Sequence, residues 1–311
     1  MQIIRPDINF DFIGKSKAAI ILSVVLILIG VASLLFKGGP NYGIDFAGGT
    51  LVQIQFAEPT SAGQIKEALK EVELGNVVVQ QFGDDANEFL VRAQQTTTEL
   101  KGLSQTVTEA LEKVYGEGKV EVRRTEMVGP QVGKDLREKG LMAILYAMIG
   151  ILIYITWRFE FRYGVGAIVA LVHDVLITLG AFSLFNKEID LPIIAAFLAI
   201  IGYSLNDTII ICDRIRENLG KHAKEGFAAI VNRSINETMS RTLLTSGTTL
   251  LVVAALFIFG GGVIHNFAFA LLVGIIAGTY STIFVVSPIL IYWEGRKTGH
   301  AGKVPTKEKT A

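Results

Sequence analysis

The sequence predicts an α-helical membrane protein: six transmembrane helices, with one ferredoxin-like βαββαβ domain inserted between helices 1 and 2. Three observations support this fold class. Half of the 311 residues are apolar, and the mean hydropathy of +0.47 is rare among soluble domains. The charged residues gather in blocks that separate long apolar runs. One of these blocks alternates between strand and helix patterns.

Six apolar runs are candidate membrane spans, because a helix needs about 20 apolar residues to cross the hydrocarbon core. The first run is longer than the roughly 7–15 residues of a signal-peptide core, and no A-x-A cleavage site follows it. We therefore interpret it as a retained anchor. The predicted spans are Ala18–Phe36, Leu141–Trp157, Val165–Phe185, Leu191–Ile211, Leu243–Phe259 and Phe267–Tyr292.

Lysine and arginine predict the orientation of these spans. Basic residues precede the first run, follow the sixth, and fill the loops between runs two and three and between runs four and five. The opposite loops, 186–190 and 260–266, contain only Lys187. Because basic loops stay in the cytoplasm, both termini should be cytoplasmic. The predicted division is a cytoplasmic N-terminus with helix 1 (1–37), an extracytoplasmic α+β domain (38–138), five transmembrane helices (139–293) and a cytoplasmic tail (294–311).

The pattern of the outer domain favours a β-α-β-β-α-β order. Strands are predicted at 50–56, 76–82, 88–94 and 119–128, and helices at 61–74 and 96–116. Ser61 with Gln64, and Thr96 with Glu99, have capping-box spacing at the two helix starts.

Chemistry-bearing residues are scarce in this outer domain, which has no histidine, no cysteine and no glycine-rich phosphate loop. We therefore expect a contacting or moving domain, not an enzyme. The single cysteine of the chain, Cys212, excludes an intrachain disulfide and a cysteine-based metal cluster. No metal or organic cofactor is expected. The formal net charge of zero gives no argument for a nucleic-acid partner, and none is predicted.

A glycine-rich segment, "NYGIDFAGGT" (41–50), precedes the outer domain. Gly43, Gly48 and Gly49 permit backbone angles that are closed to other residues. By composition alone, the segment is a tight loop that joins the anchor to the first strand.

Polar residues inside the apolar runs are the candidate functional residues, because ionisable groups in spans often mark ion pathways. Span 3 contains His173 and Asp174, and span 4 contains Asn206 and Asp207. Span 5 is preceded by Arg241, which is followed by threonines at helical spacing. An aspartate at the bilayer centre costs roughly 2.5–3.5 kcal/mol on insertion scales, so Asp207 is expected to face an interior.

Counting from the cytoplasmic ends of spans 3 and 4 puts Asp174 and Asp207 within about two turns of one another. Burial favours the neutral form of a carboxyl group, and an approaching guanidinium favours the charged form. A movement of Arg241 relative to Asp207 would then bind or release a proton. Simpler interpretations stay open: His173 could bond a backbone carbonyl with Asp174 as its partner, and Arg241 could mark the membrane interface.

Small residues recur in span 6, where Gly274 and Gly278 have small-xxx-small spacing. Such a face allows close helix packing. We expect it to pack within the bundle.

Several stretches together resemble the SecF branch of the SecD/SecF family of protein-export membrane proteins, within the proton-driven resistance-nodulation-division superfamily. The resemblance runs from about residue 8 to residue 293. The stretches are "YGIDFAGGT", "LVHDVLITLGAFSLF", "EIDLPIIAAFLAIIGYSLNDTIIICDRIREN", "SRTLLTSGTTLLV" and "GTYSTIFVVSP".

The resemblance implies a protein-transport role in the bacterial inner (plasma) membrane. Such chains pair with SecD and work beside the SecYEG channel and the SecA motor, using the proton gradient to promote export of the translocating preprotein. By position, Asp207 resembles the proton-carrying carboxylate and Arg241 its charge partner, with protons as the coupling ion. Asp174, His173 and Asn206 complete the expected proton relay, and Asp45 belongs with the glycines of the 41–50 segment. Since the chain lacks the second half of a fused SecDF protein, it should need a separate SecD.

Two other functions stay open at this point. The chain could be half of a proton-driven small-molecule exporter of the same superfamily, although such exporters usually carry two six-span halves. Alternatively, it could be a non-energised translocon scaffold whose polar residues only pack the bundle.

Overall fold

The computed structural model describes residues 9–70, 72, 77–82, 87–93, 100–222, 224–260 and 262–298. Within these residues, six helical stretches are long and apolar enough to cross a membrane, which confirms the six predicted spans. The chain is therefore a multi-pass membrane protein. The spans are α1 (Ser16–Phe36), α5 (Pro130–Arg158), α6 (Phe161–Leu184), α7 (Leu191–Lys221), α8 (Phe227–Phe259), and a last span built from α9 (Gly262–Ser281), a π-helical turn η1 (Thr282–Val286) and α10 (Ser287–Thr298).

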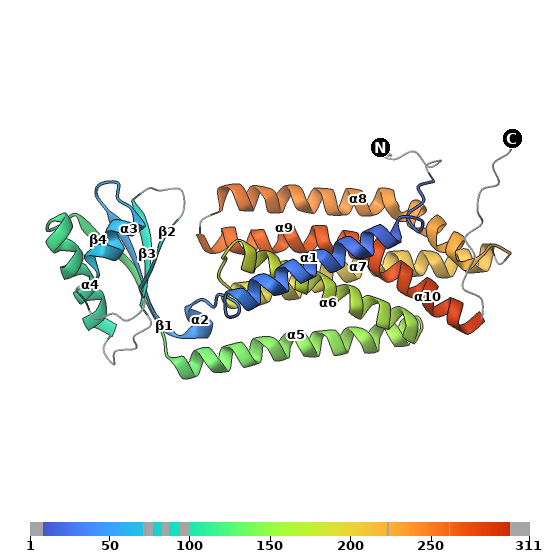
Figure 1. Ribbon diagram of the computed structural model, residues 1–311, viewed down its shortest axis with the longest axis horizontal. Helices are drawn as coiled ribbons and strands as arrows, with labels where there is room; N and C mark the ends of the chain where they lie inside the picture. Colours follow the sequence, from blue (N-terminus) through green and yellow to red (C-terminus); the bar gives the residue numbers. More distant parts are fainter. Residues whose placement is uncertain are drawn as a thin grey trace.

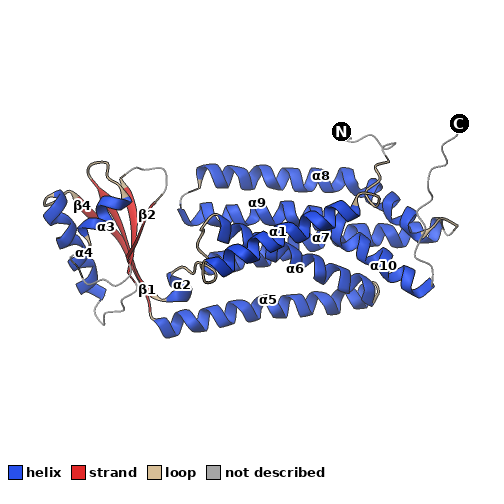
Figure 2. Cartoon of the chain, in the orientation of Figure 1, coloured by secondary structure: helices blue, strands red, loops and turns tan. Residues whose placement is uncertain are grey.

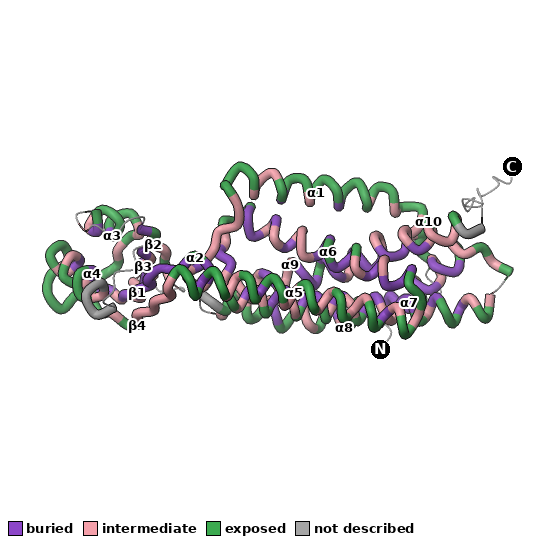
Figure 3. Tube along the Cα trace, turned by 90° about the horizontal axis from the view of Figure 1, so that it is seen from below, coloured by how far each residue is buried: buried purple, intermediate pink, exposed green. Residues whose placement is uncertain are grey.

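The bundle and the outer domain lie end to end, joined through α1 and α5 (Figure 1). The start of α1 and the end of α10 lie at the bundle end that is remote from the outer domain. Seen from below, α1 is exposed along most of its length, whereas about half of the apolar stretch is buried in α6 and in α7 (Figure 3).

Three helices extend well beyond their predicted ends. Helix α5 begins at Pro130, eleven residues before the predicted Leu141. Helix α7 continues past Ile211, and α8 begins at Phe227, sixteen residues before the predicted Leu243. The charged residues of this region form ion pairs with one another, so they do not end the helices. Arg214 of α7 donates to Glu237 of α8 and to Glu217 of its own helix, each at 2.6 Å. Charge in these segments thus marks a helical hairpin at the membrane edge, not a loop.

The outer domain has the predicted ferredoxin-like arrangement (Figure 2). Its elements are β1 (Gly49–Phe56), α3 (Ala62–Ala68), β2 (Val77–Gln81), β3 (Glu88–Ala93), α4 (Leu100–Tyr115) and β4 (Val120–Val128). The strands form one antiparallel sheet in the order β2-β3-β1-β4.

One face of this sheet holds the domain core. Val52, Ile54 and Phe89 turn toward α3 and α4 and are almost fully buried. The other face, with the alternate residues, turns toward the bundle (Figure 1). Ser61 caps α3 as predicted, accepting a hydrogen bond from the Gln64 N–H at 3.4 Å, while the predicted Thr96–Glu99 cap lies outside the described residues.

The 41–50 segment is more structured than the predicted tight loop, since it contains a short helix, α2 (Ile44–Ala47). Gly48 and Gly49 have φ values of 74° and 125°, so both need the freedom of glycine, as predicted. For Gly43 that prediction is wrong, because its φ is −70°. Gly43 is instead restricted by its neighbours: its N–H donates to the Ile189 carbonyl at 2.9 Å, and an added Cβ would lie 3.2 Å from Asp190.

Glycines also set the closest helix contacts. A Cβ on Gly274 would lie 2.3 Å from Ile200, and one on Gly278 would lie 2.9 Å from Ser204, so this face packs against α7 inside the bundle. A second contact, absent from the sequence prediction, brings α1 onto α6: a Cβ on Gly180 would lie 2.9 Å from the Gly30 Cα.

Candidate functional site

Asp174 is the centre of a polar cluster inside the bundle. It is fully buried on α6, where Nδ1 of His173 lies 2.9 Å from its Oδ1. Its Oδ2 accepts hydrogen bonds from Ser204 of α7 at 2.7 Å and from Ser281 of α9 at 3.0 Å. Both carboxylate oxygens therefore have partners, contributed by three helices.

His173 connects this cluster to α1. Its Nε2 lies 3.1 Å from the Ser23 hydroxyl, and Ser23 donates to the Tyr280 hydroxyl at 3.2 Å. The rings of His173 and Tyr280 stack with centroids 6.0 Å apart. The bond from His173 to a backbone carbonyl, which we considered above, is not what the structure contains, because its partners are side chains.

Asp207 lies on the same helix as Ser204, one turn further along, with 1% of its surface exposed. Its Oδ2 is 3.5 Å from the Ser246 hydroxyl of α8, and Ser246 in turn lies 2.9 Å from the Thr279 hydroxyl of α9. Its Oδ1 is buried and has no hydrogen-bond partner within the described parts of the chain. Asp207 is therefore held much more weakly than Asp174.

The π-helical turn η1 lies beside both aspartates. It follows Ser281 directly, and its first residue, Thr282, places a hydroxyl 3.2 Å from that of Thr208 on α7. π-turns inside α-helices are rare and frequent at functional sites. Nothing in the sequence predicted this turn, because hydroxyl residues in an apolar run are common in any span.

The remaining predicted relay residues are not in contact with the aspartates. Asn206 lies on the exposed face of α7, and no hydrogen bond joins it to Asp207 among the described residues. Arg241 is also exposed and forms no ion pair with Asp207 in the described structure. Thr245 donates back to the Arg241 carbonyl at 3.0 Å, as threonines in helices commonly do. The structure thus supports no direct contact for these two residues, and their roles stay predictions.

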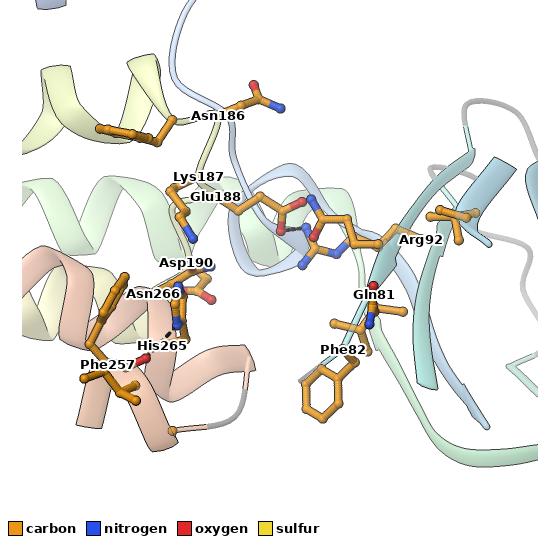
Figure 4. A pocket seen from close by; sticks show the side chains of 17 residues that line it. Gln81, Phe82, Arg92, Asn186, Lys187, Glu188, Asp190, Phe257, His265 and Asn266 are labelled. Carbon is orange, nitrogen blue, oxygen red and sulfur yellow. Dashed lines mark hydrogen bonds and ion pairs between the residues drawn. The ribbon is translucent and has the colours of Figure 1, made fainter. Parts of the chain in front are cut away.

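A second polar cluster, missed by the sequence analysis, joins the outer domain to the bundle. Arg92 of β3 forms an ion pair with the buried Glu188, which lies between α6 and α7 (Figure 4). Burial lowers the pKa of Arg92, and nearby Asp190 and Asp45 oppose that shift. The sequence did not predict this contact, because an arginine in a strand of a polar domain is usually exposed to solvent.

The start of α7 is held by the same cluster. Asp190 is the N-cap and accepts from the Ile193 N–H at 3.3 Å, while Asp45 of α2 accepts from the Leu191 N–H at 3.0 Å. Burial, followed by repulsion from Asp45, raises the pKa of Asp190 to about 6. The 41–50 segment therefore caps the helix that carries Asp207.

Comparison with known proteins decides the family. Residues 106–296 match the model for the C-terminal region of the protein export membrane proteins SecD and SecF, and residues 33–60 match the model for the SecD/SecF GG motif. The chain belongs to the SecD/SecF family. The second match covers Asp45, which caps the start of α7, together with the glycines of the 41–50 segment, and the first covers Asp174 and Asp207.

Relatives within the family are similar over nearly the whole chain. The protein translocase subunit SecF of Desulfurispirillum indicum is 51% identical over 92% of each chain, and that of Magnetococcus marinus is 49% identical over 94% of each.

Two SecDF structures share the fold. The crystal structure of SecDF from Thermus thermophilus, a translocon-associated membrane protein, aligns with a TM-score of 0.84 at 37% identity, over 94% of this chain. SecDF in a super-membrane-facing form aligns with a TM-score of 0.68 at 38% identity. This chain spans 40% of the SecDF chain in both.

Proposed function

We propose that this chain is a proton-driven auxiliary subunit of Sec protein translocation, in the bacterial inner membrane with both termini cytoplasmic. It acts with a separate SecD-type partner, beside the SecYEG channel and the SecA motor, to promote export of preproteins. Membership of the SecD/SecF family and relatives that are protein translocase subunits support this proposal. The match to 40% of SecDF supports a partner that supplies the rest.

One observation carries the proton-coupling part of the proposal: Oδ1 of the buried Asp207 has no hydrogen-bond partner among the residues that the structure describes. An ionised carboxylate with an unsatisfied oxygen is costly inside a membrane protein. Binding a proton, or meeting a cation, removes that cost. Asp174 shows the contrast, because hydroxyls and His173 already satisfy both of its oxygens.

In the proposed cycle, the Asp207 carboxyl group is neutralised alternately by a proton and by a nearby cation. In one state a proton occupies the carboxyl group, and in the other the proton has left and a charged or polar group has moved near. Arg241 is the candidate cation, on the helix that also supplies Ser246. Its approach requires a movement, because the two side chains form no ion pair in this conformation. One charge crossing 100 mV supplies about 2.3 kcal/mol, so a few protons suffice to drive a domain movement.

The proposal is tested by Asp207→Asn, with Asp213→Asn as a matched control on the exposed surface of the same helix. Export of a secreted precursor is measured in cells, and proton conduction is measured in vesicles that contain the purified complex with its SecD-type partner. We expect Asp207→Asn to lose both activities and Asp213→Asn to keep both.

The alternatives give different results in the same experiment. Normal export and proton flux with Asp207→Asn contradict the proposal. If Asp207→Asn is neutral while Gly274→Leu disrupts assembly, the chain is a scaffold. If the chain does not co-purify with SecD or SecY, and its loss causes drug sensitivity without a secretion defect, it is an exporter.

A further inference from the structure

A groove of about 650 Å³ separates the outer domain from the bundle, a size within the roughly 300–1,000 Å³ of ligand sites. We call it the junction groove. Figure 4 shows its two sides, with Phe82 and Arg92 on the sheet side and Phe257, His265 and Asn266 on the bundle side. Val79 and Gln80 of β2 also line it, as does Asn186 between α6 and α7.

The lining combines two phenylalanine rings and neutral amides with two side chains of each charge, Arg92 and Lys187 against Glu188 and Asp190. Phe82 and Phe257 offer apolar surface from opposite sides, while Gln80, Asn186 and Asn266 each offer a donor and an acceptor. Arg92 is already paired with Glu188, and the Lys187 ammonium lies 5.6 Å from the ring centroid of Phe269. This chemistry suits an occupant with peptide groups and apolar side chains better than it suits an ion.

The sheet presents an open edge at this groove. β2 is the outermost strand and pairs only with β3 among the described strands. The Phe82 N–H donates to the Glu88 carbonyl at 2.8 Å, and bonding alternates along an antiparallel strand, so the main-chain groups of Val79 point away from β3. Among the described residues, no main-chain partner of Val79 is found on this side, and open main-chain groups on an edge strand are templates for an added strand.

We infer that the junction groove binds an extended, largely uncharged segment of an unfolded polypeptide, which pairs with the edge of β2. The inference rests on the proposed function, which supplies such a chain on the outer side of the membrane. Recognition through main-chain groups does not depend on sequence, so one groove can serve many exported proteins. The amides bond the peptide groups that β2 does not reach, and the two phenylalanines take apolar side chains.

The test is site-specific photo-crosslinking in the full complex with the SecD-type partner and the SecYEG channel. A photoreactive phenylalanine analogue replaces Phe82, and a secretory precursor is arrested part-way through translocation by a folded domain at its C-terminus. The matched control places the analogue at Glu109, which is exposed on α4, on the far side of the sheet. We expect crosslinks to the arrested precursor from position 82 and not from position 109.

A pair of variants then isolates the strand edge. Val79→Pro removes the N–H that points away from β3 and leaves the bonds between β2 and β3 in place. Val79→Ala shortens the same side chain but keeps that N–H, so its crosslink yield is the reference for Val79→Pro. We expect Val79→Pro to lower the crosslink yield about fivefold relative to Val79→Ala, the factor for one net hydrogen bond. Equal membrane levels and equal protease resistance of the outer domain show that both variants fold.

Three outcomes overturn the inference: crosslinks from position 82 only to the SecD-type partner or to a second copy of this chain, equal precursor crosslinking from positions 82 and 109, or equal yields from the two Val79 variants. Each is distinguishable from failure of the proposed function, because export that depends on Asp207 is measured in the same strains.

Discussion

The charge of Asp190 should destabilise the start of α7 at neutral pH. Its pKa is displaced from 3.8 to about 6 by burial and by Asp45, which corresponds to about 3 kcal/mol. Because the displaced value is higher, the folded protein binds the proton more tightly than the unfolded chain does. Ionisation therefore weakens the fold, fully above pH 6, and the penalty disappears as the pH falls from about 6 to 3.8. Asp190→Asn removes the charge and keeps a good N-cap.

Amide hydrogen exchange of the first turns of α7 measures this effect. At pH 7.5, we expect these amides to exchange up to about 100-fold more slowly in Asp190→Asn than in the wild type, which is the factor for about 3 kcal/mol. The ratio should fall steadily between pH 6 and pH 4. Asp213→Asn, at an exposed position of the same helix, should leave the exchange unchanged. Equal rates for wild type and Asp190→Asn at pH 7.5, or a ratio independent of pH, would refute the reasoning.

Two further predictions concern glycines, each with a matched control. Gly180→Leu should destabilise the bundle by at least about 1–3 kcal/mol, because the backbone at Gly30 lies in its way, whereas Gly150→Leu meets open space and should melt near the wild-type temperature in detergent. Equal melting temperatures would contradict the close crossing. Gly48→Ala and Gly38→Ala each force a residue with a Cβ into positive φ, at about 1–3 kcal/mol. Only Gly48→Ala also meets backbone, 2.8 Å away at the start of α5, so limited proteolysis should release the outer domain faster in that variant.

The elements that could be predicted from sequence were those with a strong period or a long apolar run. Alternation in 50–56 and 119–128 predicted two strands to within one residue, and hydropathy predicted the centres of the six spans. Helix ends were less predictable, because charged residues at the membrane edge can pair across two helices. Arg214 and Glu237 do so, and the helices continue where the sequence suggested a loop.

The candidate site was predicted only in part, for a physical reason. A buried carboxylate such as Asp174 or Asp207 is conspicuous in an apolar run, because its cost is high. The partners of this cluster are serine hydroxyls, from Ser23, Ser204 and Ser281. A serine costs little free energy at any position in a span, so none of the three stands out in the sequence. Only the fold brings the three hydroxyls to one carboxylate or its histidine.

Helix α7 connects the polar cluster under the outer domain with the buried carboxyl group of Asp207. The caps at its outer end, Asp45 and Asp190, lie beside the ion pair of Arg92 with Glu188, which precedes the first residue of the helix, Leu191, by three positions. Asp207 lies about 25 Å further along the same unbroken helix. A stiff rod carries axial force without a hinge to absorb it. A force that pulls on the outer sheet is therefore transmitted along the helix that contains Asp207. A movement of that helix at Asp207 is transmitted to the sheet in the same way.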